Sequence, residues 1–337
     1  MKYCVWFCSI IFGGWPGLQG AVAAPIAITG QQQPLAAKSL VLDITPVGNN
    51  LMAVGERGHI LRLSPDGSWQ QLLSPTRNLL TRIIFIDQQQ GWAVGHDATV
   101  LHSVDGGDSW QQQYHSQTLA RPLLDVHFRD EQNGLAVGAY GLFLRTHDGG
   151  QHWQREFHGE LLGEDDRQYL QQLQTEDPEA YQQESDSILP HFNRLLALSD
   201  GRLLLVGEMG LAAVSDDFGQ HWQRLDIGYQ GSLFAALEAQ GQVYVAGLRG
   251  NLFVSDVTLQ HWQPIPLSQQ ATINGMAQLG EQLWLTGNSG VVIQLDKNHH
   301  SRLVRQLKGE NLLTLAADKT GKVWLAGTKG LQPITLK

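Results

Sequence analysis

The sequence predicts an all-β fold, a seven-bladed β-propeller, and three observations carry this prediction. A Gly-x-x-Gly turn between two short apolar runs recurs seven times, with alanine (Ala98) in place of the second glycine in one copy. The first glycine of the turn stands at Gly55, Gly95, Gly138, Gly207, Gly247, Gly287 and Gly327. Successive copies lie 40, 43, 69, 40, 40 and 40 residues apart, a period typical of propellers and solenoids. Each period has room for four short strands separated by small or polar residues, which is one propeller blade.

Within a repeat, the expected strands follow one another in a fixed order. An apolar run such as residues 79–87 or 122–130 supplies the first strand, and the run that enters the Gly-x-x-Gly turn supplies the second. The third strand leaves that turn and ends before a tryptophan, and the fourth follows the tryptophan. Because no blade can bury its faces alone, the blades are expected to stack into one ring.

Ring closure requires a further element, because the chain ends directly after the expected third strand of blade seven. Propellers avoid exposed sheet edges. We therefore expect residues 26–37 to supply the missing outer strand of blade seven.

The first 23 residues are predicted to be a signal peptide. An uncharged run at residues 3–18 follows Lys2, and Ala-Val-Ala at 21–23 fits the small-x-small pattern for cleavage after Ala23. An uncleaved membrane anchor is the alternative, although Gly13, Gly14 and Pro16 weaken such a helix. Residues 24–337 would then be a propeller domain in the periplasm or outside the cell.

The cysteines and the charge limit the chemistry that this domain can perform. Cys4 and Cys8 both lie in the predicted signal peptide, so the mature domain would have no disulfide, catalytic thiol or cysteine metal ligand. The net charge is −9, the acidity is concentrated at residues 158–190, and no phosphate-binding loop is present, which disfavours nucleic acid as a partner. Among the thirteen histidines, His152, His221 and His261 each precede a repeat tryptophan on a different blade, and His299-His300 lies in a degraded turn, so we expect no metal site and no cofactor.

The long interval between Gly138 and Gly207 predicts an acidic helical insertion at residues 158–190, between blades three and four. Asp165-Asp166 can cap a first helix with Tyr169, Leu170 and Leu173 on one side, and Asp177-Pro178 can start a second. The simpler interpretation is a flexible, solubilising loop. The more specific hypothesis is a lid over the neighbouring loops, or an element that docks a partner.

A second recurring motif, Ser/Thr-x-Asp-x-Gly-x-x-Trp, contains carboxylates that resemble catalytic groups. We interpret it as a structural turn, in which the aspartate accepts hydrogen bonds from turn amides, the glycine takes positive φ and the tryptophan is buried. The residues concerned are Asp105, Gly107, Trp110, Asp148, Gly150, Trp153, Asp217, Gly219 and Trp222. No catalytic residue is therefore expected among them.

The opposite face, made of the Gly-x-x-Gly turns and the links between blades, is the expected partner-binding surface, since loops on a rigid scaffold commonly carry function. Its candidate residues are Arg57, Arg77, Arg121, Tyr140, Arg249 and Lys329. The arginines suit a partner that bears carboxylates. Ordinary solvated charge is the alternative interpretation for each of them.

Two resemblances to known families follow from these motifs. The aspartate turns resemble the bacterial neuraminidase repeat, or Asp box. The longer phrases LLTRIIFIDQQQGWAVGHDATVLHSVDGGDSW (79–110) and RPLLDVHFRDEQNGLAVGAYGLFLRTHDGGQHW (121–153) resemble the photosystem II stability/assembly-factor family. This resemblance implies a non-enzymatic, chaperone-like propeller that binds a membrane-protein client, in photosynthesis or in another transporter or membrane complex. In that family an arginine-rich face is implicated in binding, and Arg57, Arg77 and Arg121 are the nearest candidates here.

The competing function is a glycan-binding or sialidase-like propeller, because glycosidases also use Asp-box propellers. Tyr140, Glu208 and the arginines Arg57 and Arg249 fall on the expected face for such a site. The Arg-Ile-Pro phrase typical of sialidases is absent. An enzyme would require Tyr140, Glu208 and three arginines to converge in one pocket.

Overall fold

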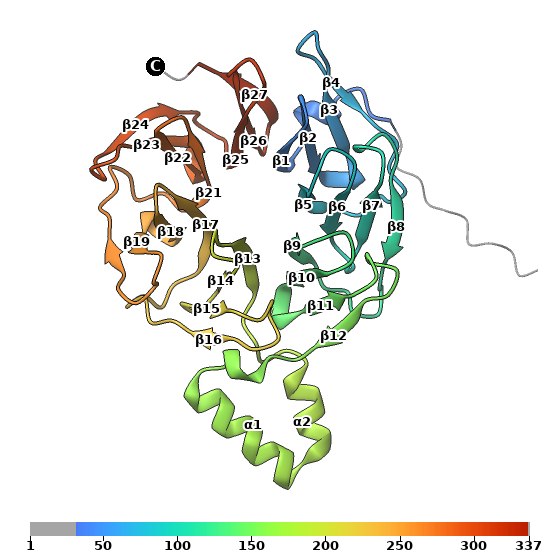
Figure 1. Ribbon diagram of the computed structural model, residues 1–337, viewed down its shortest axis with the longest axis vertical. Helices are drawn as coiled ribbons and strands as arrows, with labels where there is room; N and C mark the ends of the chain where they lie inside the picture. Colours follow the sequence, from blue (N-terminus) through green and yellow to red (C-terminus); the bar gives the residue numbers. More distant parts are fainter. Residues whose placement is uncertain (1–31, 336–337) are drawn as a thin grey trace, which may run out of the picture.

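The computed structural model describes residues 32–335, which form seven antiparallel sheets arranged as a ring around a central axis (Figure 1). The seven-bladed propeller predicted from the repeats is confirmed. The predicted signal peptide lies outside the described residues. Among the described residues, no helix combines the length and the hydrophobicity needed to cross a membrane.

The first four blades each contain four strands. They are β1 (Val41–Val47), β2 (Asn50–Gly55), β3 (Ile60–Leu63) and β4 (Trp69–Gln71); β5 (Leu80–Phe85), β6 (Gly91–Gly95), β7 (Val100–Ser103) and β8 (Gln111–Tyr114); β9 (Leu123–Phe128), β10 (Gly134–Gly138), β11 (Phe143–Thr146) and β12 (Gln154–Glu156); and β13 (Phe192–Ala197), β14 (Leu203–Gly207), β15 (Ala212–Ser215) and β16 (Gln223–Arg224).

Blades five and six also have four strands, and blade seven has three within residues 32–335. They are β17 (Leu233–Ala239), β18 (Gln242–Gly247), β19 (Leu252–Asp256) and β20 (Gln263–Pro264); β21 (Ile273–Leu279), β22 (Gln282–Gly287), β23 (Val291–Leu295) and β24 (Ser301–Gln306); and β25 (Leu312–Ala317), β26 (Val323–Gly327) and β27 (Gly330–Ile334).

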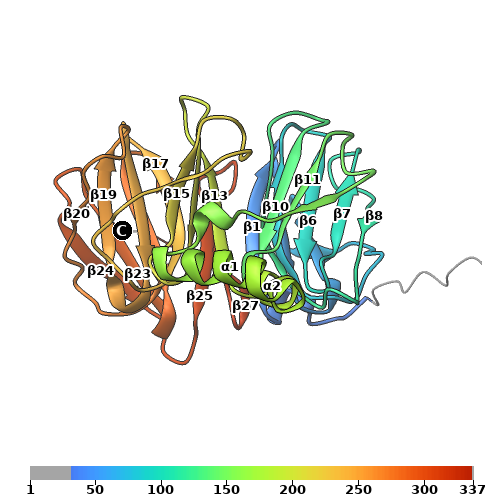
Figure 2. The same cartoon turned by 90° about the horizontal axis from the view of Figure 1, so that it is seen from below.

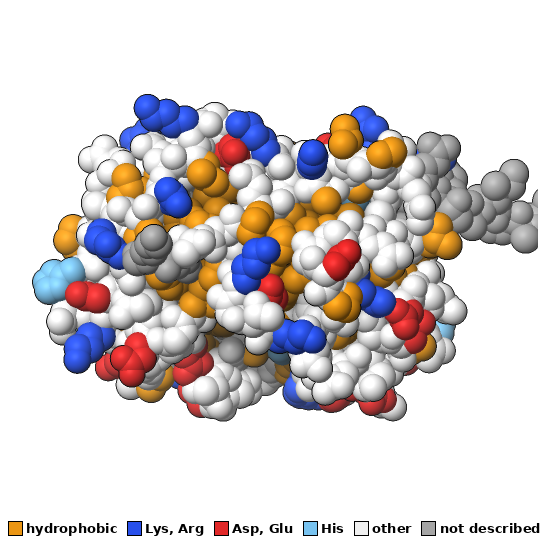
Figure 3. Space-filling model, turned by 90° about the horizontal axis from the view of Figure 1, so that it is seen from above, with side chains coloured by type: hydrophobic (Ala, Val, Ile, Leu, Met, Phe, Trp, Pro, Cys, Tyr) orange, Lys and Arg blue, Asp and Glu red, His pale blue; other side chains and the backbone are white. Residues whose placement is uncertain are grey.

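The second strand of each blade is buried on both faces, because neighbouring blades cover it from either side. In blades two, three, four and seven every residue of this strand is buried. The ring closes where β1 and β2 pack against β25 and β26, and Trp69 and Trp324 meet there edge to face with ring centroids 5.4 Å apart. Figure 3 views the rim at this seam, where hydrophobic side chains reach the surface between the two blades.

The Gly-x-x-Gly turns need glycine because of a close backbone approach. In each blade the first glycine of the turn lies against the carbonyl that precedes the first strand, and the next residue donates a backbone hydrogen bond to that carbonyl. In blade three, a Cβ added to Gly138 would lie 2.1 Å from the oxygen of Pro122, and Ala139 N donates to this oxygen at 3.0 Å. The recurring glycine therefore allows the turn after the second strand to hydrogen-bond to the residue that precedes the first strand of the same blade.

We expect Gly138→Ala to lower the free energy of unfolding by about 2–3 kcal/mol, because the new methyl group must displace backbone rather than a mobile side chain. Urea unfolding followed by fluorescence measures the change. Gly163→Ala is the matched control, since its Cβ would have only Asp166 nearby, at 3.9 Å. Equal stability of the two variants would show that the close approach is not needed for folding.

The prediction of an outer strand from residues 26–37 is wrong for the part that the structure describes. Residues 32–35 are irregular and Ala36–Lys38 form a 3-10 helix, η1, which lies against β27 and β4. Residues 26–31 lie outside the described residues. The short helix forms because Lys38 N and Ser39 N bond to carbonyls three residues back, so these amides are not available to a sheet.

Register explains how blade seven tolerates the sheet edge that is open among residues 32–335. Gly327 pairs with Gly330 across a two-residue turn, so Trp324 and Pro333 form a pair whose backbone groups point away from each other. Pro333 therefore occupies a position whose N–H would face the open edge, and proline has none to offer. This arrangement discourages a foreign strand from pairing with β27.

The predicted insertion is a helical hairpin that leaves the ring between blades three and four. It contains the 3-10 helix η4 (Gly159–Leu161) and the helices α1 (Glu164–Glu176) and α2 (Pro178–Ser185). As predicted, Asp177 caps α2, accepting a hydrogen bond from Ala180 N with Pro178 in the first turn. For α1 the prediction was wrong: the N-cap is Gly163, and Asp165 and Asp166 lie inside the first turn.

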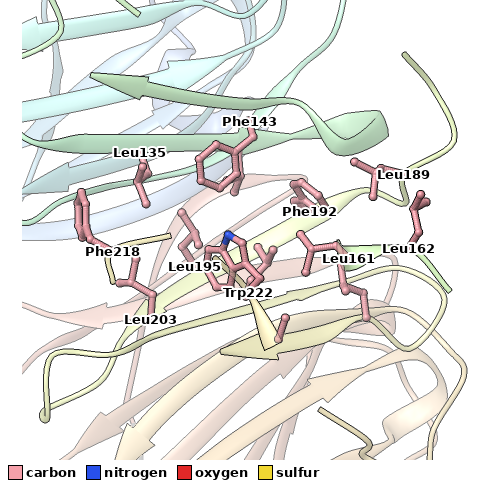
Figure 4. Close-up of a cluster of buried hydrophobic side chains, with 14 of the residues drawn as sticks. Leu135, Phe143, Leu161, Leu162, Leu189, Phe192, Leu195, Leu203, Phe218 and Trp222 are labelled. Carbon is pink, nitrogen blue, oxygen red and sulfur yellow. The ribbon is translucent and has the colours of Figure 1, made fainter. Parts of the chain in front are cut away.

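The hairpin extends outward from the perimeter and leaves the middle of the ring uncovered (Figures 1 and 2). A lid over the neighbouring loops is therefore not the arrangement in this structure. At its base, Leu161, Leu162, Leu170 and Leu189 are buried among side chains of blades three and four, including Phe143 and Trp222 (Figure 4). Tyr169, expected on the same side as Leu170, is instead exposed.

A charged cluster secures this base. Arg145 of β11 pairs with Glu156 of β12, and the buried His158 lies between Glu156 and Glu160, with Nδ1 2.9 Å from Glu160 Oε1. Burial alone would raise the pKa of Glu156, but hydrogen bonds from His158 and Arg145 outweigh it and lower this pKa to about 2. Burial likewise opposes the charged form of His158, yet Glu156 and Glu160 leave its pKa raised.

We expect acid to weaken this cluster. The folded pKa of Glu156, about 2, lies below its usual value of 4.5, so its stabilisation is complete above pH 4.5 and is lost as the pH falls toward 2. The difference in unfolding free energy between the wild type and Glu156→Gln should therefore shrink over this range. Urea unfolding at several pH values measures it, and a difference that stays constant would contradict the assignment.

Candidate functional site: the loop face

The Gly-x-x-Gly turns and the links between blades lie on one side of the ring, which we call the loop face. In blade two, Ala98 N donates to the carbonyl of Arg121 in the following link, and in blade three Gly141 N donates to Pro190 O. The turn of blade four makes the equivalent bond from Gly210 N to Gly231 O. Each of these turns is thus hydrogen-bonded to the segment that leads into the next blade, as the sequence predicts for a shared face.

Six of the seven turns hold a non-glycine residue in the left-handed region of backbone space. These residues are Arg57, Asp97, Tyr140, Met209, Arg249 and Ser289, with φ between 53° and 59°. Side chains larger than asparagine are uncommon there. Such outliers are concentrated at functional sites, so the identity of these exposed side chains is itself informative.

Blades three to five present apolar side chains at these exposed turns. Tyr140 is 49% exposed, Met209 is 66% exposed and Leu248, which precedes Arg249, is 37% exposed. Scattered exposed apolar residues need no explanation, but three on successive turns of one face make a candidate contact surface. Of these three residues, only Tyr140 was predicted from the sequence to bind a partner.

Around Tyr140 the structure assembles a compact polar and aromatic cluster. The guanidinium of Arg121 lies 5.8 Å from the centre of the Tyr140 ring, and the His191 ring meets it edge to face at 4.6 Å. His191 Nδ1 lies 3.6 Å from Glu208 Oε1. Arg121 also donates to the carbonyl of Asp186, so the C-terminal end of the insertion holds it in place.

The other predicted site residues do not join this cluster. Arg57 and Arg249 are exposed on the turns of blades one and five, and Arg77 is exposed in the link after blade one. Lys329 is exposed on the turn of blade seven, 3.6 Å from Glu310. Among residues 32–335 only Arg121 of these cations contacts Tyr140. The arginine patch is thus spread around the rim of the face, and its role in binding stays a prediction.

His191 and Met209 are site residues that the sequence did not indicate, and Glu208 was considered only for the competing sialidase-like site. His191 stands at the entry to β13, and its carbonyl accepts from Glu208 N at 3.0 Å, the same turn-to-entry bond found in every blade. That repeated bond would have placed residue 191 beside the turn of blade four. The contact with Tyr140 of blade three had no signal in the sequence.

The aspartate turns connect the third and fourth strands of their blades and lie opposite the loop face. Asp105, Asp148 and Asp217 each accept from the hydroxyl two residues earlier and from the amide four residues later. Gly107, Gly150 and Gly219 have φ of 85°, 89° and 75°. Trp110 and Trp222 are buried, and Trp153 is half-buried.

The ionisation of these aspartates suits a turn rather than acid catalysis. Hydrogen bonds from the backbone and side chain of His152 lower the pKa of Asp148 to about 2. For Asp217 burial is the largest single effect and would raise the pKa, but hydrogen bonds from His221 and Ser215 together outweigh it and lower this pKa to about 2. Such carboxylates are ionised at neutral pH and have no proton to donate.

Neither a metal centre nor a sialidase-like arginine cluster is assembled in the described residues. Within 32–335 no group of three or more His, Cys, Asp or Glu residues is placed to hold a metal ion. Tyr140 and Glu208 both contact His191, but Arg57 and Arg249 have no contact with them among these residues. The convergence of three arginines that a sialidase requires is therefore not found in this part of the chain.

Comparisons with known proteins identify relatives of the repeats. A family described as "Photosynthesis system II assembly factor YCF48" matches residues 60–121 and 114–194. The photosystem II assembly protein Ycf48 of Synechococcus sp. (strain JA-3-3Ab) is 49% identical over 45 residues, 13% of this chain. The match spans only 14% of that relative's own length.

Solved structures resemble the whole ring. A structure titled "YCF48 bound to D1 peptide" has a TM-score of 0.65 at 18% identity, over 89% of this chain and 95% of the other. YCF48 from Cyanidioschyzon merolae has a TM-score of 0.64 at 17% identity, over 89% and 97%. A streptogramin B lyase has a TM-score of 0.69 at 11% identity, over 89% and 95%. At these identities the likeness concerns the fold, and together with the family match it confirms the resemblance predicted from the repeats.

Proposed function

The chain is related to the photosystem II assembly-factor family through residues 60–194, and on that basis we propose that it is a scaffold that binds a membrane-protein client through its loop face. The proposal includes a non-enzymatic role and an exported protein, periplasmic or secreted after cleavage at Ala23. One of the solved structures that share this fold is YCF48 bound to a D1 peptide. We do not transfer the D1 client to this chain, because its acidic insertion distinguishes it from a compact propeller.

The observation that carries the proposal is the exposed cluster on blades three to five. Tyr140 and Met209 stand in left-handed backbone positions on neighbouring blades, and Arg121 lies over the Tyr140 ring. Aromatic, methionine and arginine side chains are the residue types enriched in protein interfaces. A rigid ring that presents them on short turns loses little entropy when it binds.

Site-specific photocrosslinking in the native host tests this proposal. A photoreactive amino acid is placed at position 209 on the loop face, and in a second protein at position 104, where Val104 is 60% exposed on an aspartate turn of the opposite face. We expect an adduct with an integral membrane protein from position 209 and none from position 104. Adducts of equal yield from both faces, or adducts with soluble proteins alone, would contradict the proposal.

A variant pair then assigns the contact to Tyr140. Tyr140→Ser should reduce the crosslink from position 209 about tenfold, since loss of an interface aromatic costs on the order of 1–2 kcal/mol. Ser289→Ala changes the equivalent left-handed position of blade six and should leave the crosslink unchanged. N-terminal sequencing of the exported protein separately tests cleavage after Ala23.

A further inference from the structure

The central channel of the ring contains a cavity of about 300 Å³ that the loop-face proposal does not use. All seven inner strands contribute to its wall. The polar part includes Asp43, Arg82 and Arg194, and the apolar part includes Phe234, Met276 and Leu313. A cavity of this size lies at the lower end of the range for small-molecule sites.

A ladder of alternating charges runs along one side of this channel. Each inner strand has a register shift two residues after its start, and the residues at this position are equivalent in all seven blades. In order they are Asp43, Arg82, Asp125, Arg194, Ala235, Gly275 and Thr314. The alternation of acid and base covers blades one to four and stops at blade five.

The two arginines of the ladder have different surroundings. Arg82 lies between two carboxylates, with Nη1 2.9 Å from Asp43 and Nε 3.1 Å from Asp125. Arg194 has one, because Nε lies 3.6 Å from Asp125 and the equivalent residue of blade five is Ala235. Within residues 32–335 the Arg194 side chain makes no hydrogen bond, and its exposed quarter lines the cavity.

We propose that the central channel binds a small organic carboxylate, whose oxygens pair with Arg194 where an acid from blade five would otherwise stand. The planar guanidinium can take both carboxylate oxygens at once. Phe234, Met276 and Leu313 on the wall favour an organic anion over an inorganic one, because they can cover its apolar part. The site is independent of the loop face and of any client.

The opposite pKa shifts of the two arginines indicate that Arg194 lacks an anionic partner that Arg82 has. Burial lowers the pKa of Arg194, and the neighbouring Arg82 lowers it further, while Asp125 and Asp43 only partly offset these effects. For Arg82, by contrast, the two flanking carboxylates outweigh burial and the pKa is raised. A bound carboxylate would give Arg194 the two-sided pairing that Arg82 already has.

A comparison on the wild-type protein tests the chemistry of the ligand. The melting temperature is measured with sodium butyrate, with butyramide, and with sodium chloride at the ionic strength of the butyrate sample. We expect butyrate to raise it and the other two solutes to leave it unchanged, because only the carboxylate can pair with Arg194. A rise of equal size with butyramide or with chloride overturns the proposal.

Three variants assign the effect to the channel. In Arg194→Met, butyrate binding followed by calorimetry should weaken at least tenfold, as expected for loss of a charge-assisted pair. In Ala235→Asp, the protein supplies the missing acid itself, so the same loss is expected in a chain that keeps Arg194. Arg305→Met, an exposed arginine of β24, should bind as the wild type does. Undiminished binding by either channel variant overturns the proposal.

Discussion

Replacing Arg82 with methionine is expected to lower the free energy of unfolding by about 3–5 kcal/mol. This guanidinium pairs with Asp43 and Asp125, whose side chains are only 3% and 1% exposed. Each carboxylate also accepts an amide of the next blade, Ile83 N at 3.0 Å and Leu195 N at 2.8 Å. Methionine would keep much of the volume but leave the buried Asp43 without its paired cation and Asp125 with only the longer contact to Arg194, which is the costly way to break a buried pair.

The loss concerns the whole ring, because the ladder joins blades one to four through their inner strands. The free energy of unfolding of natural domains is about 5–15 kcal/mol, so Arg82→Met should remove a large part of it. Urea unfolding measures this loss of stability. The exposed Arg305→Met serves as the matched control, for which we expect a change below about 0.5 kcal/mol. Similar values for the two variants would mean that the ladder contributes little to stability.

The deficit of Arg82→Met should also depend on pH. Burial already raises the pKa of Asp43 more than Arg82 and Arg194 lower it, and removal of Arg82 should raise this pKa further. A folded-state pKa above the unfolded value means that the buried acid destabilises the protein at neutral pH and that this cost falls as the acid is protonated. The difference from the wild type should therefore be smaller at acidic pH than at neutral pH.

Replacing Arg145 with methionine is expected to cost about 3 kcal/mol and to act locally. Arg145 is 5% exposed and makes two hydrogen bonds to Glu156, at 2.6 and 2.9 Å. It makes two more, both at 2.8 Å, to the carbonyls of Phe218 and Gly219 in blade four. Methionine would leave a partly buried carboxylate and two buried carbonyls without these donors.

Hydrogen exchange distinguishes a local effect from a global one. We expect faster amide exchange at residues 143–162 and 213–224, on the two sides of the seam, and unchanged exchange in blades six and seven. Arg129→Met is the matched control, because Arg129 also lies over Phe218, at 4.5 Å, but is exposed and pairs with the exposed Asp130. Exposed pairs of this kind contribute about 0–1 kcal/mol. Uniformly faster exchange around the ring would contradict a local role for Arg145.

The loop-face cluster shows how far local patterns predict a site. Tyr140 was predicted because it sits inside a recurring turn, and the turn is defined by residues close in sequence. Its partner His191 and the adjacent Glu208, which contacts His191, lie about 50 and 70 residues further along the chain and come from the next blade. The distance between two blades depends on how their sheets pack, and no repeat spacing encodes it.

Blade seven shows where a general rule, and not a local sequence pattern, led to a wrong prediction. The repeat pattern correctly predicted that the C-terminal end of the chain supplies three strands of blade seven. A fourth strand was assigned to residues 26–37 only because an open sheet edge is unfavourable. In the described residues the edge strand β27 is protected in another way, because η1 covers its start and Pro333 removes an outward N–H. A general rule against open edges does not specify which device satisfies it.

The sequence by itself determined the number of blades, the faces to which the turns belong and the position of the acidic insertion. These properties follow from a repeat whose parts are neighbours in the chain, such as Gly138 and the carbonyl of Pro122 that excludes any larger residue there. Only the tertiary structure decided that the hairpin extends outward, that Arg121 and His191 meet at Tyr140, and that the charge ladder leaves Arg194 one acid short. Those outcomes depend on side chains from different blades, which come together only when the ring closes.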